Sequence, residues 1–454
     1  MATVIGLAVA LWGFAIGLRQ LFDNSFLTHL ATGRIIVSKM RVPTRDPYSF
    51  TASGRPWTVF SWFASLAYGL SERLAGLGAI RVLHALLAGA AMLAIWRLSR
   101  PARSLVGRLA SVVLPGAVAT GLWTHRPFMF GVVGLALVLV VLDSDVDPRW
   151  LVPVMWVWVN SHGSFPLAVA AVGAVALGAR LDGGHARREL RVLAWVLVGI
   201  VAGAVNPIGP RILASPFELL GKSADFRSVV EWQAPRFSDA SQLAALAQLL
   251  VAVLLLVRRP RWRTALPLVV FAGLALTSAR NLPLLSLVLV PGMAQAIGDT
   301  RLASGLDGRR RSPATALGAA AVVIVALVLA SAVGPQQDMV LSAYPLGALR
   351  AADRAGVSRR LVTQDFVGNL RELRDGPRGE VFIDDRVDMY PSSVIADYEL
   401  LLKARAGWDG VLRRWRADGV LWSRNQPLAQ VLAESGRWRL VYRDRTWVLF
   451  VPAR

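Results

Sequence analysis

Long apolar runs separated by short polar loops fill the first three quarters of the chain. A helix that crosses a bilayer needs about 20 mostly apolar residues, or somewhat fewer where the bilayer thins. Eleven runs meet this requirement: residues 3–21, 79–97, 108–124, 128–143, 149–161, 164–180, 191–206, 241–257, 264–279, 282–298 and 315–334. A further run, residues 57–75, is apolar as well, and counting it as a crossing changes the orientation of every later segment.

Four clusters of arginine decide how the run 57–75 is interpreted. They lie at Arg97 to Arg108, Arg187 to Arg191, Arg258 to Arg263 and Arg309 to Arg311. Basic loops of membrane proteins face the cytoplasm. All four clusters do so, with the loop 19–56 outside, only if 57–75 does not cross and lies as an interfacial or re-entrant helix. The pattern predicts about eleven transmembrane helices, a cytoplasmic N-terminus and an extracytoplasmic C-terminus.

The pattern changes after residue 334. Short β-like runs occur at 360–364, 380–385, 419–423, 438–444 and 446–452, and helix-like segments lie near 391–404, 409–417 and 426–435. The sequence therefore predicts an all-α polytopic membrane domain, residues 1–334, with interfacial helices in its first outer loop. A small extracytoplasmic α/β domain, residues 335–454, follows it.

Composition agrees with a polytopic membrane protein. Of the 454 residues, 55% are hydrophobic and only 17% are charged, and the mean hydropathy is +0.49. The net charge of +21 comes from loop arginines without a basic stripe that alternates with aromatic residues, which argues against nucleic acid as a partner. The chain contains no cysteine, so disulfides and thiolate metal sites are excluded.

Candidate chemistry gathers in the loops predicted to lie outside. Ionisable residues close to the membrane are costly, so several of them on one face indicate a function. The candidates are Asp23, His29 and Asp46 in the first loop, His125 and Arg126 in the second, His162 in the third and Arg280 in the fifth.

Each candidate also has a simpler structural interpretation, which the sequence leaves open. Asp23 can cap a helix that starts at residue 24, and Asp46 before Pro47 is a common turn former. His125 and Arg126 can anchor a helix end at the lipid headgroups. His162 can be a hydrogen-bonded turn residue, and Arg280 can pair with a headgroup phosphate.

Several segments together resemble the GT-C superfamily of membrane glycosyltransferases. The chain is similar, more narrowly, to a bacterial group of GT-C-like membrane proteins of poorly defined activity. The segments that carry the resemblance are DNSFLTHLATGRIIVSKMRVPTRDPYSFTASGRPWTVFSW, RPFMFG, WVNSHGSF, NPIGPRIL, VVEWQAPRF, SARNLP and VFIDDRVDMY. In this resemblance Asp23 falls where the catalytic acid of the superfamily is expected. Many members carry a second acid beside it, whereas this chain has Asn24.

The resemblance implies an enzyme that moves a sugar from a polyprenyl-phosphate carrier to a glycan, lipid or protein of the cell envelope. Asp23 would be the general base, with Asp46 as a second catalytic acid, and the histidines and arginines would bind the substrate. A divalent cation stays open as a cofactor, with no metal-ligating residue assigned. One alternative is a non-catalytic scaffold that binds a lipid-linked sugar or a partner protein through its C-terminal domain. A transporter is disfavoured because the ionisable residues lie at helix ends.

Overall fold

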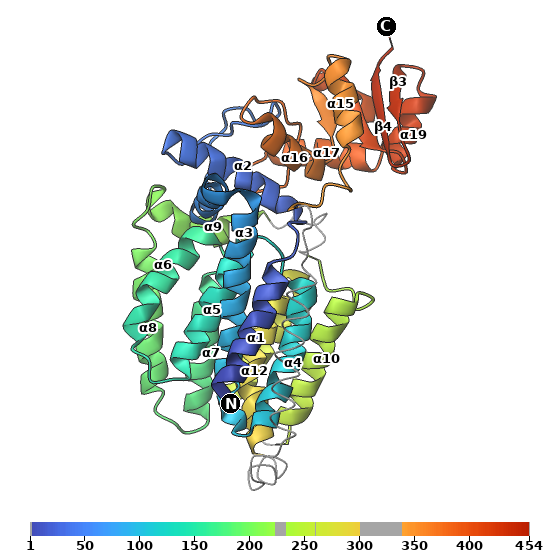
Figure 1. Ribbon diagram of the computed structural model, residues 1–454. Helices are drawn as coiled ribbons and strands as arrows, with labels where there is room; N and C mark the ends of the chain where they lie inside the picture. The colour runs from blue at the N-terminus through green and yellow to red at the C-terminus, as the bar shows by residue number, and fades with distance from the viewer. Residues whose placement is uncertain (1, 223–232, 259, 300–337, 454) are drawn as a thin grey trace. The chain divides into compact units, whose positions relative to one another are not determined.

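The computed structural model describes residues 2–222, 233–258, 260–299 and 338–453 (Figure 1). The chain forms two compact units, and neither is continuous in sequence. The first contains Met1–Leu21, Ser71–Glu218 and Arg227–Asp338. The second contains Phe22–Leu70, Leu219–Phe226 and Met339–Arg454, so the first loop packs with the C-terminal segment. The domain boundary predicted at residues 334 and 335 lies outside the described residues.

The first unit is helical. Ten of the eleven predicted apolar runs coincide with described helices, and the run 315–334 lies outside the described residues. The ten helices are α1 (Ala2–Gly17), the later part of α3 (Trp62–Leu98), α4 (Leu105–Leu122), α5 (Phe128–Leu142), α6 (Leu151–Ser161), α7 (Pro166–Leu181), α8 (Arg187–Ala202), α10 (Ala240–Leu256), α11 (Trp262–Thr277) and α12 (Leu282–Gly298). A short helix, α9 (Ser215–Gly221), is divided between the two units. Short 3-10 helices are η1 (Arg100–Ala102), η2 (Pro148–Trp150), η3 (Gly209–Ala214) and η5 (Ala279–Asn281).

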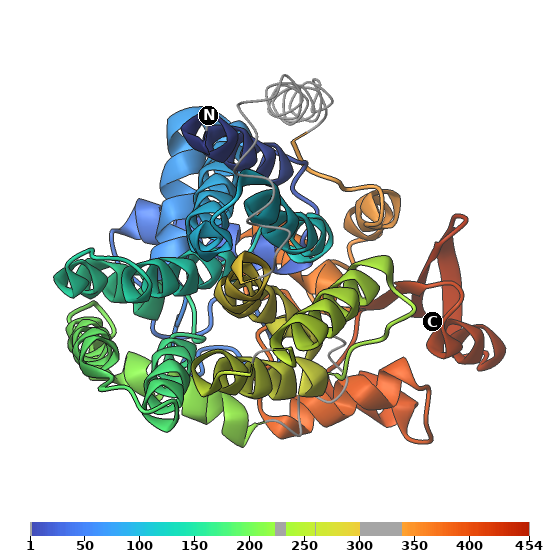
Figure 2. The same cartoon turned by 90° about the horizontal axis from the view of Figure 1, so that it is seen from below.

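Helix α12 lies at the centre of this unit. It packs against α4, α10 and α11, as Figure 2 shows from below. Every residue from Leu282 to Ala294 except Pro291 is buried, and almost all of them are apolar. A helix that is apolar on all sides is expected in a core or in a membrane.

Three segments are long and apolar enough to cross a membrane by length and composition. They are Trp62–Ala102, Leu105–Leu122 and Ala279–Gly298, and five further apolar helices have 10–17 residues. The chain is therefore that of a membrane protein. The expected number of eleven crossings stays a prediction.

Helix α3 is interrupted where the sequence predicts a boundary. Ala75 (φ −152°, ψ 32°) and Gly76 (φ 69°, ψ −165°) are not helical, and they separate the run 57–75 from the run 79–97. The positive φ at Gly76 is one that glycine adopts without a steric penalty. The helix itself begins at Trp62, so residues 57–61 are not part of it.

A four-stranded sheet organises the C-terminal part of the second unit. Its order is β1-β2-β4-β3, with β1 parallel to β2 and the other pairs antiparallel. The strands are β1 (Leu361–Thr363), β2 (Gly419–Ser423), β3 (Trp438–Arg443) and β4 (Trp447–Pro452). The helices are α15 (Leu346–Arg354), α16 (Asp365–Asp375), α17 (Ser392–Leu402), α18 (Trp408–Arg414) and α19 (Pro427–Glu434).

One predicted strand, residues 380–385, is not in this sheet. The backbone of Val381 pairs instead with the first loop: its N–H donates to the Tyr48 carbonyl, and its carbonyl accepts from Phe50 N–H, both at 2.9 Å. Thr51 Oγ1 also donates to the Phe382 carbonyl at 2.6 Å. The predicted strand is therefore reduced to an isolated bridge at Val381, whose partner is a loop more than 300 residues earlier in the chain.

Helix α2 (Asn24–Lys39) lies in the second unit, where it crosses the first part of α3 at two glycines. A Cβ atom added at Gly69 would lie 2.5 Å from the carbonyl carbon of Gly33, and one added at Gly33 would collide with the Ser65 carbonyl. Helix α16 packs against α2 as well. Close approach of the α2 and α3 backbones therefore depends on Gly33 and Gly69.

We expect Gly33→Ala to lower the thermal unfolding temperature of the purified protein, because the added methyl group collides with backbone and forces the helices apart. Overpacking of this kind costs about 1–3 kcal/mol or more. Gly410→Ala in α18 is the matched control, because a Cβ atom there meets no atom within 4 Å. Equal stability of the two variants would contradict the crossing.

Candidate active site

Asp23 begins α2 as its N-cap residue. Its backbone is extended (φ −79°, ψ 132°), and its Oδ1 atom accepts a hydrogen bond from Ser25 N–H at 2.9 Å. The residue is only 6% exposed. A carboxylate at this position satisfies an otherwise unbonded N–H group and is favoured by the helix dipole. The capping role of Asp23 is confirmed, and the cap holds its carboxylate in a defined place.

The C-terminal segment surrounds the first turn of α2. The Tyr344 hydroxyl donates to Asn24 Oδ1 at 3.2 Å, and Asn369 Nδ2 donates to the Asn24 carbonyl at 3.2 Å. Ser25 Oγ donates to Asp385 Oδ2. Burial, and after it the negative charges of Asp23 and Asp385, raises the pKa of Tyr344 well above its ordinary value. Its hydroxyl therefore stays protonated and acts as a donor.

Arg386 binds the first loop to the C-terminal segment. Its guanidinium makes two hydrogen bonds to Asp384, from Nε to Oδ1 at 2.8 Å and from Nη2 to Oδ2 at 2.6 Å. Its Nη1 atom donates to Asp46 Oδ1 at 2.8 Å, and Nη2 lies 3.0 Å from Glu372 Oε1. The cation also faces the ring of Trp57, 4.5 Å from the ring centre. One buried guanidinium thus binds three carboxyl groups.

The charges of this cluster fix the protonation of its members. Burial, and after it the charge of Asp384, raises the pKa of Glu372 well above its usual range. Burial also opposes ionisation of Asp384, but the charge and hydrogen bonds of Arg386 outweigh it and lower the pKa of Asp384. Glu372 is therefore the member that keeps a proton, while Asp384 is ionised.

Asp46 is a buried turn residue in addition to a ligand of Arg386. Its Oδ1 atom accepts from Tyr48 N–H at 3.1 Å, and Oδ2 accepts from Ser49 N–H at 3.1 Å and from Ser49 Oγ at 2.5 Å. Both oxygens are engaged, as in an aspartate that stabilises a turn. The residue that we consider for the general base is therefore Asp23, not Asp46.

The other expected site residues fall in both units. His29 lies in the second unit, with Nδ1 3.3 Å from Ser65 Oγ. His125 lies in the first unit, where its Nε2 atom is 3.2 Å from the Gly17 carbonyl and its ring packs edge-on against His84, with ring centres 5.0 Å apart.

Two loops of the first unit meet at His162. Its Nδ1 atom is 2.8 Å from Ser164 Oγ. Its ring packs against the ring of Phe128, with 5.2 Å between the ring centres, and Phe128 follows Arg126 by two residues. Arg126 itself is half-buried. Arg280 lies in η5, which packs against α11 and α12. The His125–Phe128 turn and the His162 turn are therefore neighbours, while their membership of one site stays a prediction.

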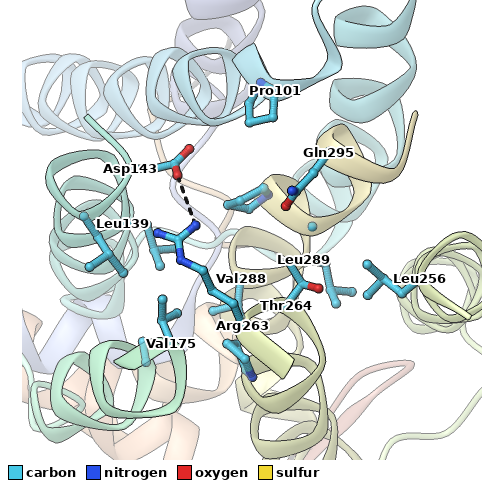
Figure 3. Close-up of a pocket in the computed structure, with 15 residues that line it drawn as sticks. Pro101, Leu139, Asp143, Val175, Leu256, Arg263, Thr264, Val288, Leu289 and Gln295 are labelled. Atoms are coloured by element: carbon cyan, nitrogen blue, oxygen red, sulfur yellow. Dashed lines mark ion pairs between the residues drawn. The ribbon is translucent and has the colours of Figure 1, made fainter. Parts of the chain in front are cut away.

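A cavity of about 60 Å³ in the first unit does not contain these residues (Figure 3). Its lining is mostly apolar side chains of α5, α7, α11 and α12. The polar lining residues include Asp143, whose carboxylate lies 3.9 Å from Arg263, and Gln295. None of the expected site residues lines it, and the candidate site is therefore not this cavity.

Four charged residues of the second unit did not appear among the candidates from sequence. They are Glu372, Asp384, Asp385 and Arg386. Three of them fall in VFIDDRVDMY, a segment with an unusual density of acids beside one arginine. That density of acids marks the segment in the sequence. It does not identify the partners of Arg386 and Asp385, because Asp46 and Ser25 lie more than 300 residues away.

Comparison with solved structures shows a fold similar to that of an oligosaccharyltransferase. No known protein-family model matches the sequence, and no curated protein does. Among the solved structures that match is the oligosaccharyltransferase of Archaeoglobus fulgidus in its apo form, with a TM-score of 0.52 and 13% identity. The match covers 93% of this chain and 69% of that one. At this identity the likeness concerns the fold alone.

We expect Arg386→Met to destabilise the protein strongly, since it leaves buried carboxylates without a cation. Breaking a buried ion pair in this way costs about 3–5 kcal/mol. Arg413→Met is the control, because Arg413 is 69% exposed and its pair with Asp409 is a surface pair. Similar unfolding temperatures for both variants would show that the Arg386 network does not hold the unit together.

Glu372→Gln tests the protonation of the cluster. A carboxyl pKa that is raised by folding contributes stability below the ordinary carboxyl pKa, and this stability is lost as the pH rises through the raised pKa. The glutamine variant resembles the protonated form, so we expect it to be at least as stable as wild type at neutral pH and to lose less stability on alkalinisation. Thermal unfolding as a function of pH measures both. A variant as unstable as Asp384→Asn would contradict the assignment.

Proposed function

We propose that the protein is a GT-C-type membrane glycosyltransferase that moves a sugar from a polyprenyl-phosphate carrier to an acceptor of the cell envelope. The observation that carries the proposal is the position of Asp23. It is the first acid after the first apolar helix of a chain whose fold is similar to that of an oligosaccharyltransferase. Its side chain is buried and fixed by the hydrogen bond with which it caps α2. A buried carboxylate fixed at a helix start is suited to act as a general base.

The proposed reaction is a single displacement at the anomeric carbon of the sugar. The acceptor hydroxyl attacks this carbon, Asp23 takes the hydroxyl proton, and the bond to the phosphate oxygen breaks with its electron pair leaving on the phosphate. The departing phosphate gains charge and needs donors. His125, Arg126, His162 and Arg280 are proposed to provide them, and His29 on α2 is proposed to bind the substrate as well.

The membrane arrangement is part of the proposal. We place the reaction on the outer face, with about eleven crossings, a cytoplasmic N-terminus and the 335–454 domain outside, because this arrangement keeps all arginine clusters in the cytoplasm. A divalent cation stays open as a cofactor. Among the described residues, no group of three or more histidine, aspartate or glutamate side chains is arranged to hold one.

A non-catalytic scaffold that binds a lipid-linked sugar or a partner protein is the second candidate. The observation that favours it is the Asp23–Asn24 pair, in which the acid acts as a helix cap and its neighbour is an amide. A cap by itself explains why an aspartate occupies position 23.

The decisive experiment compares wild type with Asp23→Asn in sugar transfer. Purified protein in lipid nanodiscs is given radiolabelled polyprenyl-phosphate hexoses or pentoses and a cell-envelope extract as acceptor. Wild type should transfer label and Asp23→Asn should lose about 10²–10⁴-fold in rate, the usual contribution of a general base. Asparagine is also a good N-cap, so the variant should fold normally.

Glu399→Gln, which removes a carboxylate from a surface pair with Lys403, is the control and should keep full transfer. Transfer by Asp23→Asn at the wild-type rate would rule out the base. Absence of transfer by wild type, with retained binding of the labelled carrier lipid, would favour the scaffold.

A further inference from the structure

The cavity of the first unit has a polar end and an apolar interior (Figure 3). Asp143 directly follows α5, Arg263 lies in the first turn of α11, and Gln295 lies in the last turn of α12. The apolar lining lies deeper in the same helices: Leu139 is one turn before Asp143, and Val288 is two turns before Gln295. The cavity therefore changes from polar to apolar along the helix axes.

Residues that do not suit a helix interior leave room for this cavity. Pro267 of α11 and Pro291 of α12 both line it, and a proline inside a helix removes a backbone hydrogen bond and kinks or breaks the helix. Gly292 lines it as well, and a Cβ atom added there would approach other atoms no closer than 3.4 Å. The volume of about 60 Å³ accommodates roughly four groups of the size of a water molecule or a methylene. The cavity can therefore take a short segment of an apolar chain.

The polar end holds one cation and one carboxylate that are not hydrogen-bonded to each other. Arg263 Nη1 lies 3.9 Å from Asp143 Oδ1, which is longer than a hydrogen bond. The Arg263 guanidinium is also paired with Glu189, whose Oε1 atom lies 3.2 Å from Nη2. The side chains of Arg263 and Asp143 are 37% and 29% exposed, so a ligand can reach both. A group that carries both a phosphate and an ammonium complements this pair.

Neighbouring side chains hold the two charged residues in place. Asp182, the residue after α7, accepts hydrogen bonds from Trp262 N–H at 2.8 Å and from Arg263 N–H at 2.9 Å, and so fixes the start of α11. Arg188 Nη2 donates to a carbonyl of the last turn of α5 at 2.7 Å, close in the chain to Asp143. The two charges are thus presented by helix ends whose positions are fixed.

We propose that this cavity binds a phospholipid with a primary ammonium in its head group, such as phosphatidylethanolamine. The phosphate lies against Arg263, the ammonium lies against Asp143, and a segment of one acyl chain enters the apolar interior. Both head-group contacts are charge-assisted hydrogen bonds, which are the strong ones. A quaternary ammonium is recognised instead by aromatic rings, and none of the described residues that line the cavity is aromatic.

This lipid site is separate from the transfer reaction proposed above. Its polar end carries part of the arginine cluster from Arg258 to Arg263, which the sequence predicts to face the cytoplasm. The lipid then comes from the cytoplasmic leaflet, whereas we place sugar transfer on the outer face. The inference therefore does not depend on the proposed function.

Native mass spectrometry of the full chain tests the head-group contacts. The titrated lipids are phosphatidylethanolamine, phosphatidylcholine and phosphatidylglycerol with identical acyl chains, and we expect the first to bind wild type most tightly. Asp143→Asn should weaken its binding about tenfold, as for the loss of one charge-assisted hydrogen bond. Asp145→Asn, which removes an exposed carboxylate of the same loop, is the matched control and should bind like wild type. Equal affinities for the three lipids, or equal affinities of the two variants, would overturn the inference.

A cavity-filling variant tests the apolar interior. Gly292→Leu places a side chain in the cavity, so we expect it to lose the preference for phosphatidylethanolamine. Gly273→Leu in α11 is the control and should keep it, because a Cβ atom there meets no atom within 4 Å. Glycerophosphoethanolamine, which has the head group without acyl chains, should not displace the lipid. Displacement by this compound at equal concentration would indicate a site for a small molecule and overturn the assignment to a lipid.

Photolabelling tests the wild-type protein directly and does not require that Gly292→Leu folds. Phosphatidylethanolamine with a diazirine on its acyl chain should label peptides that contain Val175 or Val288, which line the cavity. An excess of unlabelled phosphatidylethanolamine, but not of phosphatidylcholine, should suppress this labelling. Labelling of α8 without labelling of these peptides, or equal suppression by both lipids, would overturn the proposed site.

Discussion

The contact on which the second unit depends is the ion network of one guanidinium. Arg386 reaches Asp384 and Glu372 of the C-terminal segment and Asp46 of the first loop, and it is nearly inaccessible to solvent. Three carboxyl groups around one cation are tolerated because burial and the charge of Asp384 keep Glu372 protonated. Such a cluster contributes specificity more than net stability, because only one arrangement of the loop satisfies all its hydrogen bonds.

The position of helix α2 depends on this attachment of the first loop to the C-terminal segment. It is weakly apolar, and its burial comes from contacts on two sides: the glycine crossing with α3 and the side chains of α16. Its start is bound by Tyr344, Asn369 and Asp385. The surroundings that fix the place of the Asp23 carboxylate are contributed largely by residues after position 339.

The sequence predicted the elements better than their partners. The apolar runs located ten described helices, and four of the five β-like runs are strands, because periodicity and composition are local properties. The fifth run, residues 380–385, pairs with the first loop, and no local pattern encodes that choice. Asp23 was identified by its place after the first helix and Asp46 by its turn. Arg386 and Asp385 were not, because what makes them important is contact with residues more than 300 positions away.

The discontinuous second unit has a consequence for biosynthesis. Residues 22–70 are made first, whereas their partners, residues 339–454, are translated well after them. At about 5–20 residues per second, the intervening segment of roughly 270 residues takes on the order of half a minute to synthesise. Throughout that time the start of α2 lacks Tyr344, Asn369 and Asp385, and the carboxylate of Asp46 lacks Arg386. The unit that contains Asp23 is thus completed only after residues 339–454 have been made, so its assembly depends on a segment that is translated much later than α2.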